Sequence, residues 1–147
     1  MNGINQVNNI NKQNNVNTIK PKELKRTEFK SKFEKIKSEQ VREHLKNIYD
    51  KIVEQSDKIG EKLYLKDLIE YKKLVREFLN VAVNNSHVFS KENFLDRRGR
   101  HRVYGIVKNV DRELSSLTRE FLNEEVDRLS IIKKLDGIKG MLLDVFM

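Results

Sequence analysis

Basic side chains are concentrated in one short segment of the sequence. The segment holds four arginines and one histidine within six positions: Arg97, Arg98, Arg100, His101 and Arg102. A guanidinium group carries a planar fork of N–H donors that matches phosphate oxygens. The segment also leads into the first turn of a predicted helix, whose free N–H groups suit the same oxygens. This arginine cluster therefore predicts contact with a phosphate group, a nucleic acid or another partner.

A structural interpretation competes with the functional one. The arginines could form a solvated connector, or pair with Glu92, Asp96 and Asp111 to hold the loop. The charge distribution favours this interpretation, because residues 1–37 hold nine basic and three acidic residues, whereas the rest of the chain holds 21 basic and 19 acidic residues. Most of the net charge of +8 thus lies in a basic N-terminal tail and not on the body of the protein.

The other polar residues form no recognisable catalytic or metal-binding pattern. His44, His87 and His101 are far apart and show neither an HxxxH nor an HExxH spacing. The sequence contains no glycine-rich phosphate loop and no nucleophile elbow. Cysteine is absent, which excludes disulfides, thiolate zinc sites and thiol nucleophiles. We therefore expect a protein that is not an enzyme, has no catalytic residues and uses no metal or cofactor.

The stretch from residue 64 to 89 is the element around which the other helices are expected to pack. Five of its residues share one face at helical spacing: Leu68, Tyr71, Val75, Phe78 and Ala82. From Leu74 onward apolar residues surround the helix nearly completely, which is typical of a helix covered on several sides. Burial of each such side chain contributes about 1.5 to 3 kcal/mol. These five residues are the predicted core hub.

Three further segments show helical periodicity. Together with the hub segment, which as a helix starts near residue 65, they predict helices over about residues 28–58, 65–89, 102–124 and 127–146. Thr27 is the expected N-cap of the first helix, and Gly60 its expected stop. The apolar spacing shifts between Ile36 and Val41, so the sequence predicts either a kink near Ser38 or a break with Ser38 capping a second helix.

Two glycines lie inside the last predicted helix. Gly137 and Gly140 each cost about 1 kcal/mol relative to alanine in a helix interior. Glycines three apart remove side chains from one face, so we expect another helix, such as the hub, to approach closely there. A local break near Asp136 is the alternative.

These elements predict an all-α protein with one domain. Residues 27–147 form a single helical bundle of four to five helices, and the Asn-rich, basic residues 1–26 form a disordered N-terminal arm. No apolar run approaches the length of about 18 residues that a membrane span needs. The N-terminus is polar and cysteine is absent, so we expect a cytoplasmic protein without membrane contact.

Two segments together resemble the YaaR-type family of small bacterial proteins. They are residues 96–104, DRRGRHRVY, followed by Ile106 and Val107, and residues 135–144, LDGIKGMLLD. The similarity extends from about Lys20 to the C-terminus. The resemblance implies a compact all-α domain in the bacterial cytoplasm, within an essentially uncharacterised family. Genes of that family tend to lie near those for thymidylate kinase and a clamp-loader subunit, which hints at DNA replication.

Two functional hypotheses follow. The first is a non-enzymatic interaction or scaffold protein that holds a protein partner or a second copy of itself, because Phe29, Phe33 and Ile36 exceed what a four-helix core needs. The second is a replication-linked nucleic-acid accessory factor that binds phosphates through the arginine cluster. A small phosphorylated ligand at the same arginines is a third possibility.

Overall fold

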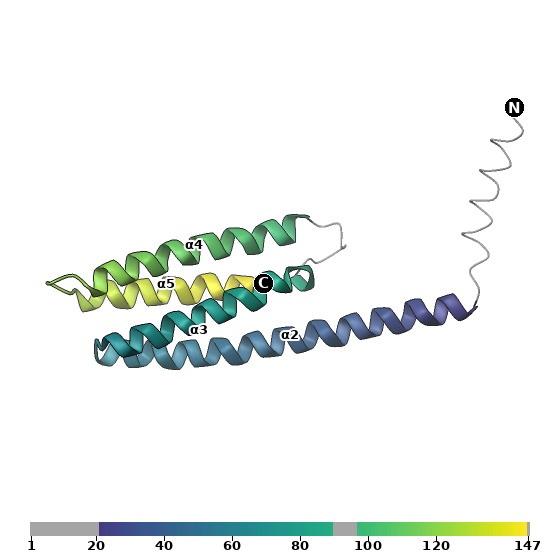
Figure 1. The fold of residues 1–147 in the computed structure, drawn as a ribbon, viewed down its shortest axis with the longest axis horizontal. Coiled ribbons are helices and arrows are strands. Elements are labelled where there is room, and N and C mark those ends of the chain that lie inside the picture. Colours follow the sequence, from purple (N-terminus) through teal and green to yellow (C-terminus); the bar gives the residue numbers. More distant parts are fainter. Residues whose placement is uncertain (1–20, 90–96, 147) are drawn as a thin grey trace, which may run out of the picture. The chain divides into compact units, whose positions relative to one another are not determined.

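The computed structural model describes the backbone of residues 21–89 and 97–146 (Figure 1). In these ranges it contains helices and no strand: α2 (Pro21–Glu61), α3 (Leu65–Asn84), the 3-10 helix η1 (Ser86–Phe89), α4 (Arg97–Phe121) and α5 (Arg128–Phe146). The predicted all-α class is confirmed. The predicted disordered arm, residues 1–26, lies outside the described residues except for residues 21–26, which belong to α2.

The chain divides into two compact units, Met1–Ser38 and Glu39–Met147. The boundary falls inside α2, where the apolar spacing shifts. On a helix that advances about 100° per residue, the set Phe29, Phe33 and Ile36 is rotated by about 120° from the set that begins at Val41. The backbone continues as α-helix through Ser38, so the predicted break with a second cap is wrong.

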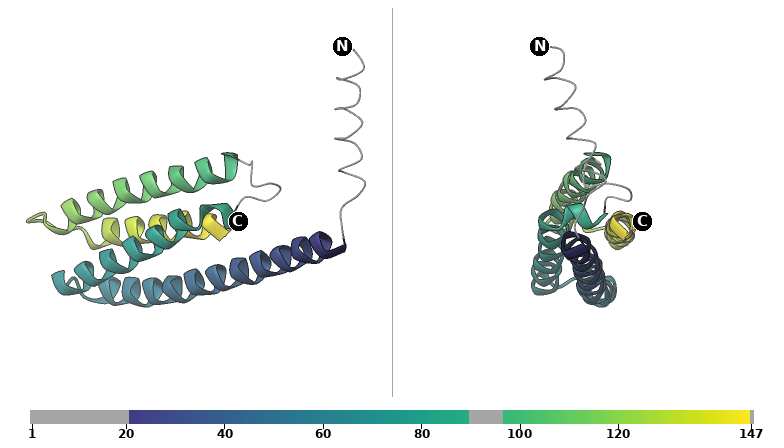
Figure 2. Two further views of the ribbon diagram at one scale, coloured as in Figure 1. Left: turned by 45° about the vertical axis from the view of Figure 1, so that its right-hand side comes forward. Right: turned by 90° about the vertical axis from the view of Figure 1, so that its right-hand side faces the viewer.

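The second unit is an up-and-down bundle of four helices. Residues 39–61 of α2 run antiparallel to α3, α3 to α4, and α4 to α5 (Figure 1). Seen end-on in Figure 2, right, the helices occupy four corners in the order α2, α3, α4, α5, so that α2 and α4 are diagonal. Among the described residues no helix is long and apolar enough to span a membrane.

The core of the bundle follows the predicted stripes. Every residue of the predicted hub is buried: Leu68, Tyr71, Val75, Phe78 and Ala82. The Phe78 ring meets the Phe146 ring edge-on with centroids 5.9 Å apart, and Tyr49 meets the same ring at 6.4 Å. Aromatic pairs in this geometry contribute beyond their buried area. The α3 helix is therefore the central element of the core, as its sequence predicts.

Several predicted helix ends differ from the structure. The α2 helix begins at Pro21, so Thr27 lies inside it and is not its N-cap. Gly60 belongs to α2 and has no positive φ, so it is not a left-handed C-cap. The α4 helix begins at Arg97, five residues before the expected start, and includes the arginine cluster. Turn composition alone did not reveal these ends, because charged residues continue a helix as readily as they leave it.

Candidate interaction surface

The arginine cluster forms the first turns of α4. The backbones of Arg97 and Arg98 belong to the helix, but their side chains lie outside the described residues. Their predicted contact with a phosphate group or another partner therefore lies outside the described residues as well. Arg100 and His101 are exposed. Arg102 is half-buried and donates hydrogen bonds to the carbonyls of Asp144 and Val145, the latter at 3.5 Å. One arginine of the cluster thus holds the end of α5, in keeping with the structural interpretation.

Arg42 is a second arginine at the same helix end. Its guanidinium donates to the carbonyl of Phe146 at 3.4 Å and to that of Val88 at 3.3 Å. The last turn of α5 contains no basic residue of its own. Its unpaired carbonyls carry partial negative charge, which favours a cation from elsewhere. A last turn without lysine or arginine is the sequence signal that could have pointed to such a cap.

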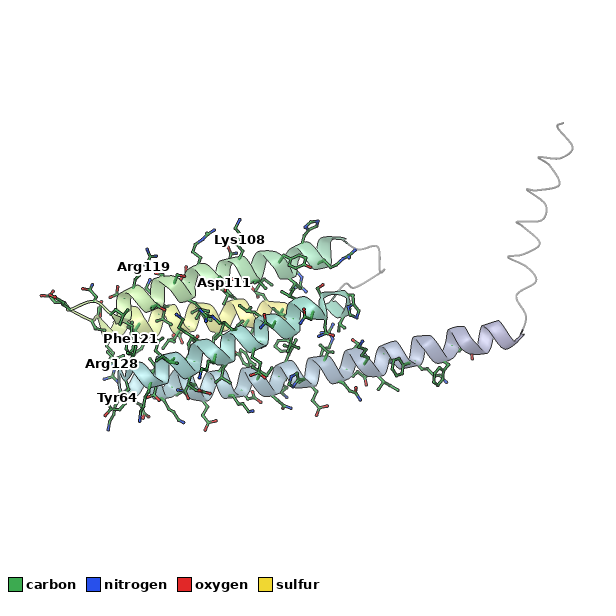
Figure 3. The ribbon with its side chains drawn as sticks, viewed as in Figure 1. Tyr64, Lys108, Asp111, Arg119, Phe121 and Arg128 are labelled. Carbon is green, nitrogen blue, oxygen red and sulfur yellow. The ribbon has the colours of Figure 1, made fainter. Side chains whose placement is uncertain are left out.

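A third arginine caps the opposite end of the bundle (Figure 3). Arg128, at the start of α5, donates to the Gly60 carbonyl through Nε at 2.7 Å and also through Nη2. This hydrogen bond joins the α4–α5 turn to the end of α2. Gln55 adds a bond from its side-chain nitrogen to the Asp67 carbonyl, at 3.0 Å. The polar contacts at this end therefore hold helices together.

The predicted close approach at Gly137 and Gly140 is wrong. Both glycines are exposed on α5, and a Cβ built on either would meet nothing within 4 Å. The helix is unbroken at Asp136, so the alternative of a local break is wrong as well. These glycines lie on the solvent side of α5, because the buried positions Leu135, Ile138 and Leu142 occupy its other face.

No metal centre is assembled within the described residues. No three His, Cys, Asp or Glu side chains in that part of the chain lie close enough to share a metal ion. One buried polar group stands apart: the Tyr71 hydroxyl has no hydrogen-bond partner among the described residues. Burial raises the pKa of this hydroxyl above its ordinary value, and the nearby charge of Asp136 raises it further. A neutral, buried phenol of this kind is a poor acid or base.

An exposed apolar surface lies on the N-terminal part of α2. Phe29, Phe33 and Ile36, here called the apolar stripe, expose 72%, 59% and 54% of their surface. Exposed lysines flank them at positions 32, 35 and 37. Single exposed apolar residues are ordinary in folded proteins, whereas here three bulky ones share one helix face.

A second unpartnered surface is a pair of grooves along the α2–α5 seam of the bundle. The first, here called the Gly60 groove, has a volume of about 360 Å³. Its polar lining is mainly acidic, with Asp57, Glu61 and Asp136 against Lys139, and its floor includes Ser56 and Gly60. The second groove, of about 650 Å³, is lined by Tyr49, Leu143 and Phe146 with charged side chains at its rim. Grooves of this size accept side chains of a partner.

Taken together, the fold and these surfaces define a small all-α bundle protein with an exposed apolar stripe on a basic helix segment. The chain belongs to the family described as "Protein of unknown function (DUF327)", whose model matches residues 4–146. It is 29% identical over 120 residues to "Uncharacterized protein YaaR" of Bacillus subtilis (strain 168), an alignment that covers 80% of this chain and 81% of the relative. The resemblance to YaaR-type proteins is thereby confirmed.

Two solved structures share the fold. The crystal structure of uncharacterized protein BH1478 from Bacillus halodurans matches with a TM-score of 0.71 and 33% identity, over 80% of this chain and 97% of that one. "Moevan: a designed granulopoietic protein by topological rescaffolding" matches with a TM-score of 0.65 and 27% identity, over 75% of this chain and 94% of that one. Both similarities support the helical architecture.

Proposed function

We propose that the protein is a non-enzymatic interaction module of the bacterial cytoplasm and that the apolar stripe is its binding surface. The observation that carries this proposal is the exposure of Phe29, Phe33 and Ile36, each more than half uncovered on a helix. Full burial of one such side chain contributes about 1.5 to 3 kcal/mol. A protein partner that covers all three therefore gains several times the energy of a surface hydrogen bond.

The charges around the stripe favour an acidic partner surface. Residues 21–38 carry seven basic and three acidic side chains. Lysine stems extend the apolar contact area, while their ammonium groups steer acidic partners toward it. The proposal therefore specifies a protein surface with an apolar centre and carboxylates around it.

Affinity capture with the full chain tests the proposal. The double variant Phe29→Ser with Phe33→Ser removes two residues of the stripe, and we expect it to lose the proteins that the parent retains, including any captured second copy. Leu129→Ser is the matched control, because Leu129 is 63% exposed on α5 and belongs to the other compact unit. Equal capture by the parent, the double variant and the control would contradict the proposal.

Nucleic-acid binding is the second candidate function, supported by the exposure of Arg100 and His101 at the start of α4. Binding led by phosphates weakens steeply as salt rises. We expect a variant with Arg97, Arg98 and Arg100 changed to Gln to lose affinity for DNA or RNA and to flatten that salt dependence. Arg102 is kept in this variant because it caps α5. A parent protein that binds neither polymer at low salt removes this candidate.

A further inference from the structure

One end of the bundle, the end that carries the α2–α3 and α4–α5 turns, exposes apolar side chains. Tyr64 and Leu65, where the chain enters α3, expose 49% and 50% of their surface, and Leu122, directly after α4, exposes 65%. Figure 3 shows Tyr64 and Phe121, the residue before Leu122, at this same end. All of these residues belong to the compact unit Glu39–Met147. The bundle end, as this surface is called here, is therefore separate from the apolar stripe.

The two turns at the bundle end carry opposite charge. The charged residues from position 62 to 66 are both basic: Lys62 and Lys66. Those from position 123 to 127 are all acidic: Glu124, Glu125 and Asp127. The last turns of α2 and α4 each add one basic and one acidic residue, so they leave this contrast unchanged. A basic turn thus lies beside an acidic turn.

The charges of both turns are exposed and not neutralised within the chain. None of Lys62, Glu124 and Glu125 makes an ion pair with another residue whose side chain is described. The Lys66 ammonium lies 5.6 Å from the centroid of the Tyr64 ring, which keeps this charge at the turn. Each turn therefore combines exposed apolar surface with charge of one sign.

The two turns also differ in length. Residues 122–127 join α4 to α5, whereas only residues 62–64 join α2 to α3. The hydrogen bond from Arg128 to the Gly60 carbonyl sets the start of α5 level with the end of α2. The longer turn consequently projects farther than the shorter one (Figure 1). The bundle end is stepped, with a projecting acidic turn beside a recessed basic turn.

We infer that two copies of this chain join at their bundle ends, with the projecting acidic turn of each lying on the recessed basic turn of the other. The two-fold axis of this pair runs between the two turns and parallel to them, perpendicular to the bundle. Rotation about this axis sets unlike turns together, and every contact occurs twice. An axis that crosses both turns would set like charges together, so the charges select the first arrangement.

The order of the helices at the four corners determines which helix ends meet. Because α3 neighbours α4 and α2 neighbours α5 (Figure 2), this rotation sets the start of α3 opposite the end of α4 of the second copy. Tyr64 and Leu65 then lie opposite Leu122 of the second copy. The lysines of the basic turn face the glutamates of the acidic turn across the contact. Apolar surface is thus covered by apolar surface, and each charge meets the opposite charge.

The contact is small, so the pair is weak. With four helices each about 10 Å wide, a bundle end offers roughly 400 Å² per copy. Stable complexes bury about 1,200 to 2,000 Å² in total. We therefore expect a dimer that forms at high protein concentration and dissociates at the low concentrations of an affinity capture. The inference goes beyond the proposed function and uses no residue of the apolar stripe.

Sedimentation equilibrium of the full chain, over a concentration series that reaches the millimolar range, tests the inference. We expect the parent to dimerise. Lys62→Glu with Lys66→Glu makes both turns acidic and is expected to weaken the dimer about tenfold or more. Glu124→Lys with Glu125→Lys makes both turns mainly basic and is expected to have the same effect. The chain with all four changes is expected to dimerise again, because the reversed charges pair.

Matched controls separate the bundle end from the rest of the unit. Lys108→Glu with Arg112→Glu reverses two exposed charges on α4 away from the bundle end, and we expect it to dimerise like the parent. Leu122→Ser is expected to weaken the dimer, whereas Tyr104→Ser, on a residue that is 49% exposed near the start of α4, is expected to leave it unchanged. Circular dichroism checks that every variant folds.

The outcomes that overturn the inference differ from those that remove the proposed function. A parent that stays monomeric in the millimolar range overturns the inference, as does a four-fold variant that stays monomeric. The stripe variant Phe29→Ser with Phe33→Ser is expected to dimerise like the parent in this measurement. If it loses the dimer while the turn variants keep it, the pairing belongs to the stripe and the inference fails. A dimer that follows the turn charges supports the inference even where capture through the stripe fails.

Discussion

Two stretches of α2 look alike as sequence and differ as structure. Residues 29–36 and residues 41–52 both place bulky apolar side chains three or four positions apart. In the second stretch Leu45 and Ile52 are fully buried within the bundle unit. In the first stretch Phe29 is 72% exposed. The same pattern therefore marks core in one unit and an open surface in the other.

The difference teaches what apolar periodicity encodes. A stripe of this spacing specifies a helix with one water-avoiding face, but it does not specify what covers that face. The 41–52 stripe finds the hub residues of α3 within its own unit. The 29–36 stripe is rotated by about a third of a turn and carries more lysine, so it does not continue the core face of α2.

A pair of matched truncations tests this contrast and is expected to give the largest effect. Phe78→Ala empties a fully buried position beside Phe146, and we expect it to lower the free energy of unfolding by about 3 to 5 kcal/mol. Phe33→Ala removes the same atoms from an exposed position and is expected to change it by less than about 0.5 kcal/mol in the monomer. Urea unfolding followed by circular dichroism measures both.

A dilution series separates folding from association in this measurement. If Phe33→Ala destabilises the monomer as strongly as Phe78→Ala, the stripe belongs to the core and the contrast between the two units fails. A loss that appears only at high protein concentration would instead indicate that the stripe takes part in self-association.

A smaller effect separates the arginines of the cluster from one another. Arg102→Gln removes a cation from the carbonyls at the end of α5, and we expect a loss of about 1 to 2 kcal/mol in the free energy of unfolding. Arg100→Gln, two residues earlier and exposed, is expected to have no measurable effect. Thermal unfolding of the two variants measures the difference. Equal losses would mean that the cluster acts as one structural unit.

Much of the fold could be predicted from periodicity because buried side chains repeat at helical spacing. The hub residues from Leu68 to Ala82 are an example, as their burial on α3 follows directly from their positions. Ends of helices were harder, since Thr27 and Gly60 have the composition of caps but lie inside α2. The hydrogen bonds that stabilise the observed helix ends, such as that from Arg128 to the Gly60 carbonyl, join residues far apart in sequence.

The candidate surface was only partly predictable for a related physical reason. The sequence points to Phe29, Phe33 and Ile36 as surplus apolar residues, and the structure leaves them exposed. The sequence gives no signal for the Gly60 groove, because α2 and α5 form that groove only after they pack. Tertiary contacts also decide that the Arg102 side chain donates hydrogen bonds to the carbonyls at the end of α5.

The two exposed glycines of α5 provide a gain instead of a loss. Gly137→Ala and Gly140→Ala each add a Cβ that meets nothing within 4 Å. We expect each to raise the free energy of unfolding by about 0.5 to 1 kcal/mol, since alanine loses less backbone entropy in a helix. Chemical denaturation measures the gain. A lower free energy of unfolding at either position would instead support the close helix approach that the sequence predicts.

The smallest effect at neutral pH concerns Tyr71, the one buried polar group without a partner among the described side chains. Tyr71→Phe removes a hydroxyl that receives no compensation for leaving water, so we expect the free energy of unfolding to stay equal or rise by up to about 1 kcal/mol. Tyr104→Phe, on an exposed residue of α4, is the control.

High pH turns the same substitution into a larger effect. In the unfolded chain a tyrosine ionises near pH 10, whereas burial raises the pKa of Tyr71 in the folded protein. Above pH 10 the unfolded state therefore binds fewer protons than the folded state, and stability falls as pH rises toward the raised pKa. Tyr71→Phe is expected to unfold at higher denaturant than the parent by a margin that grows between about pH 9 and pH 11. A constant margin would mean that the Tyr71 hydroxyl reaches water or a partner in the folded protein.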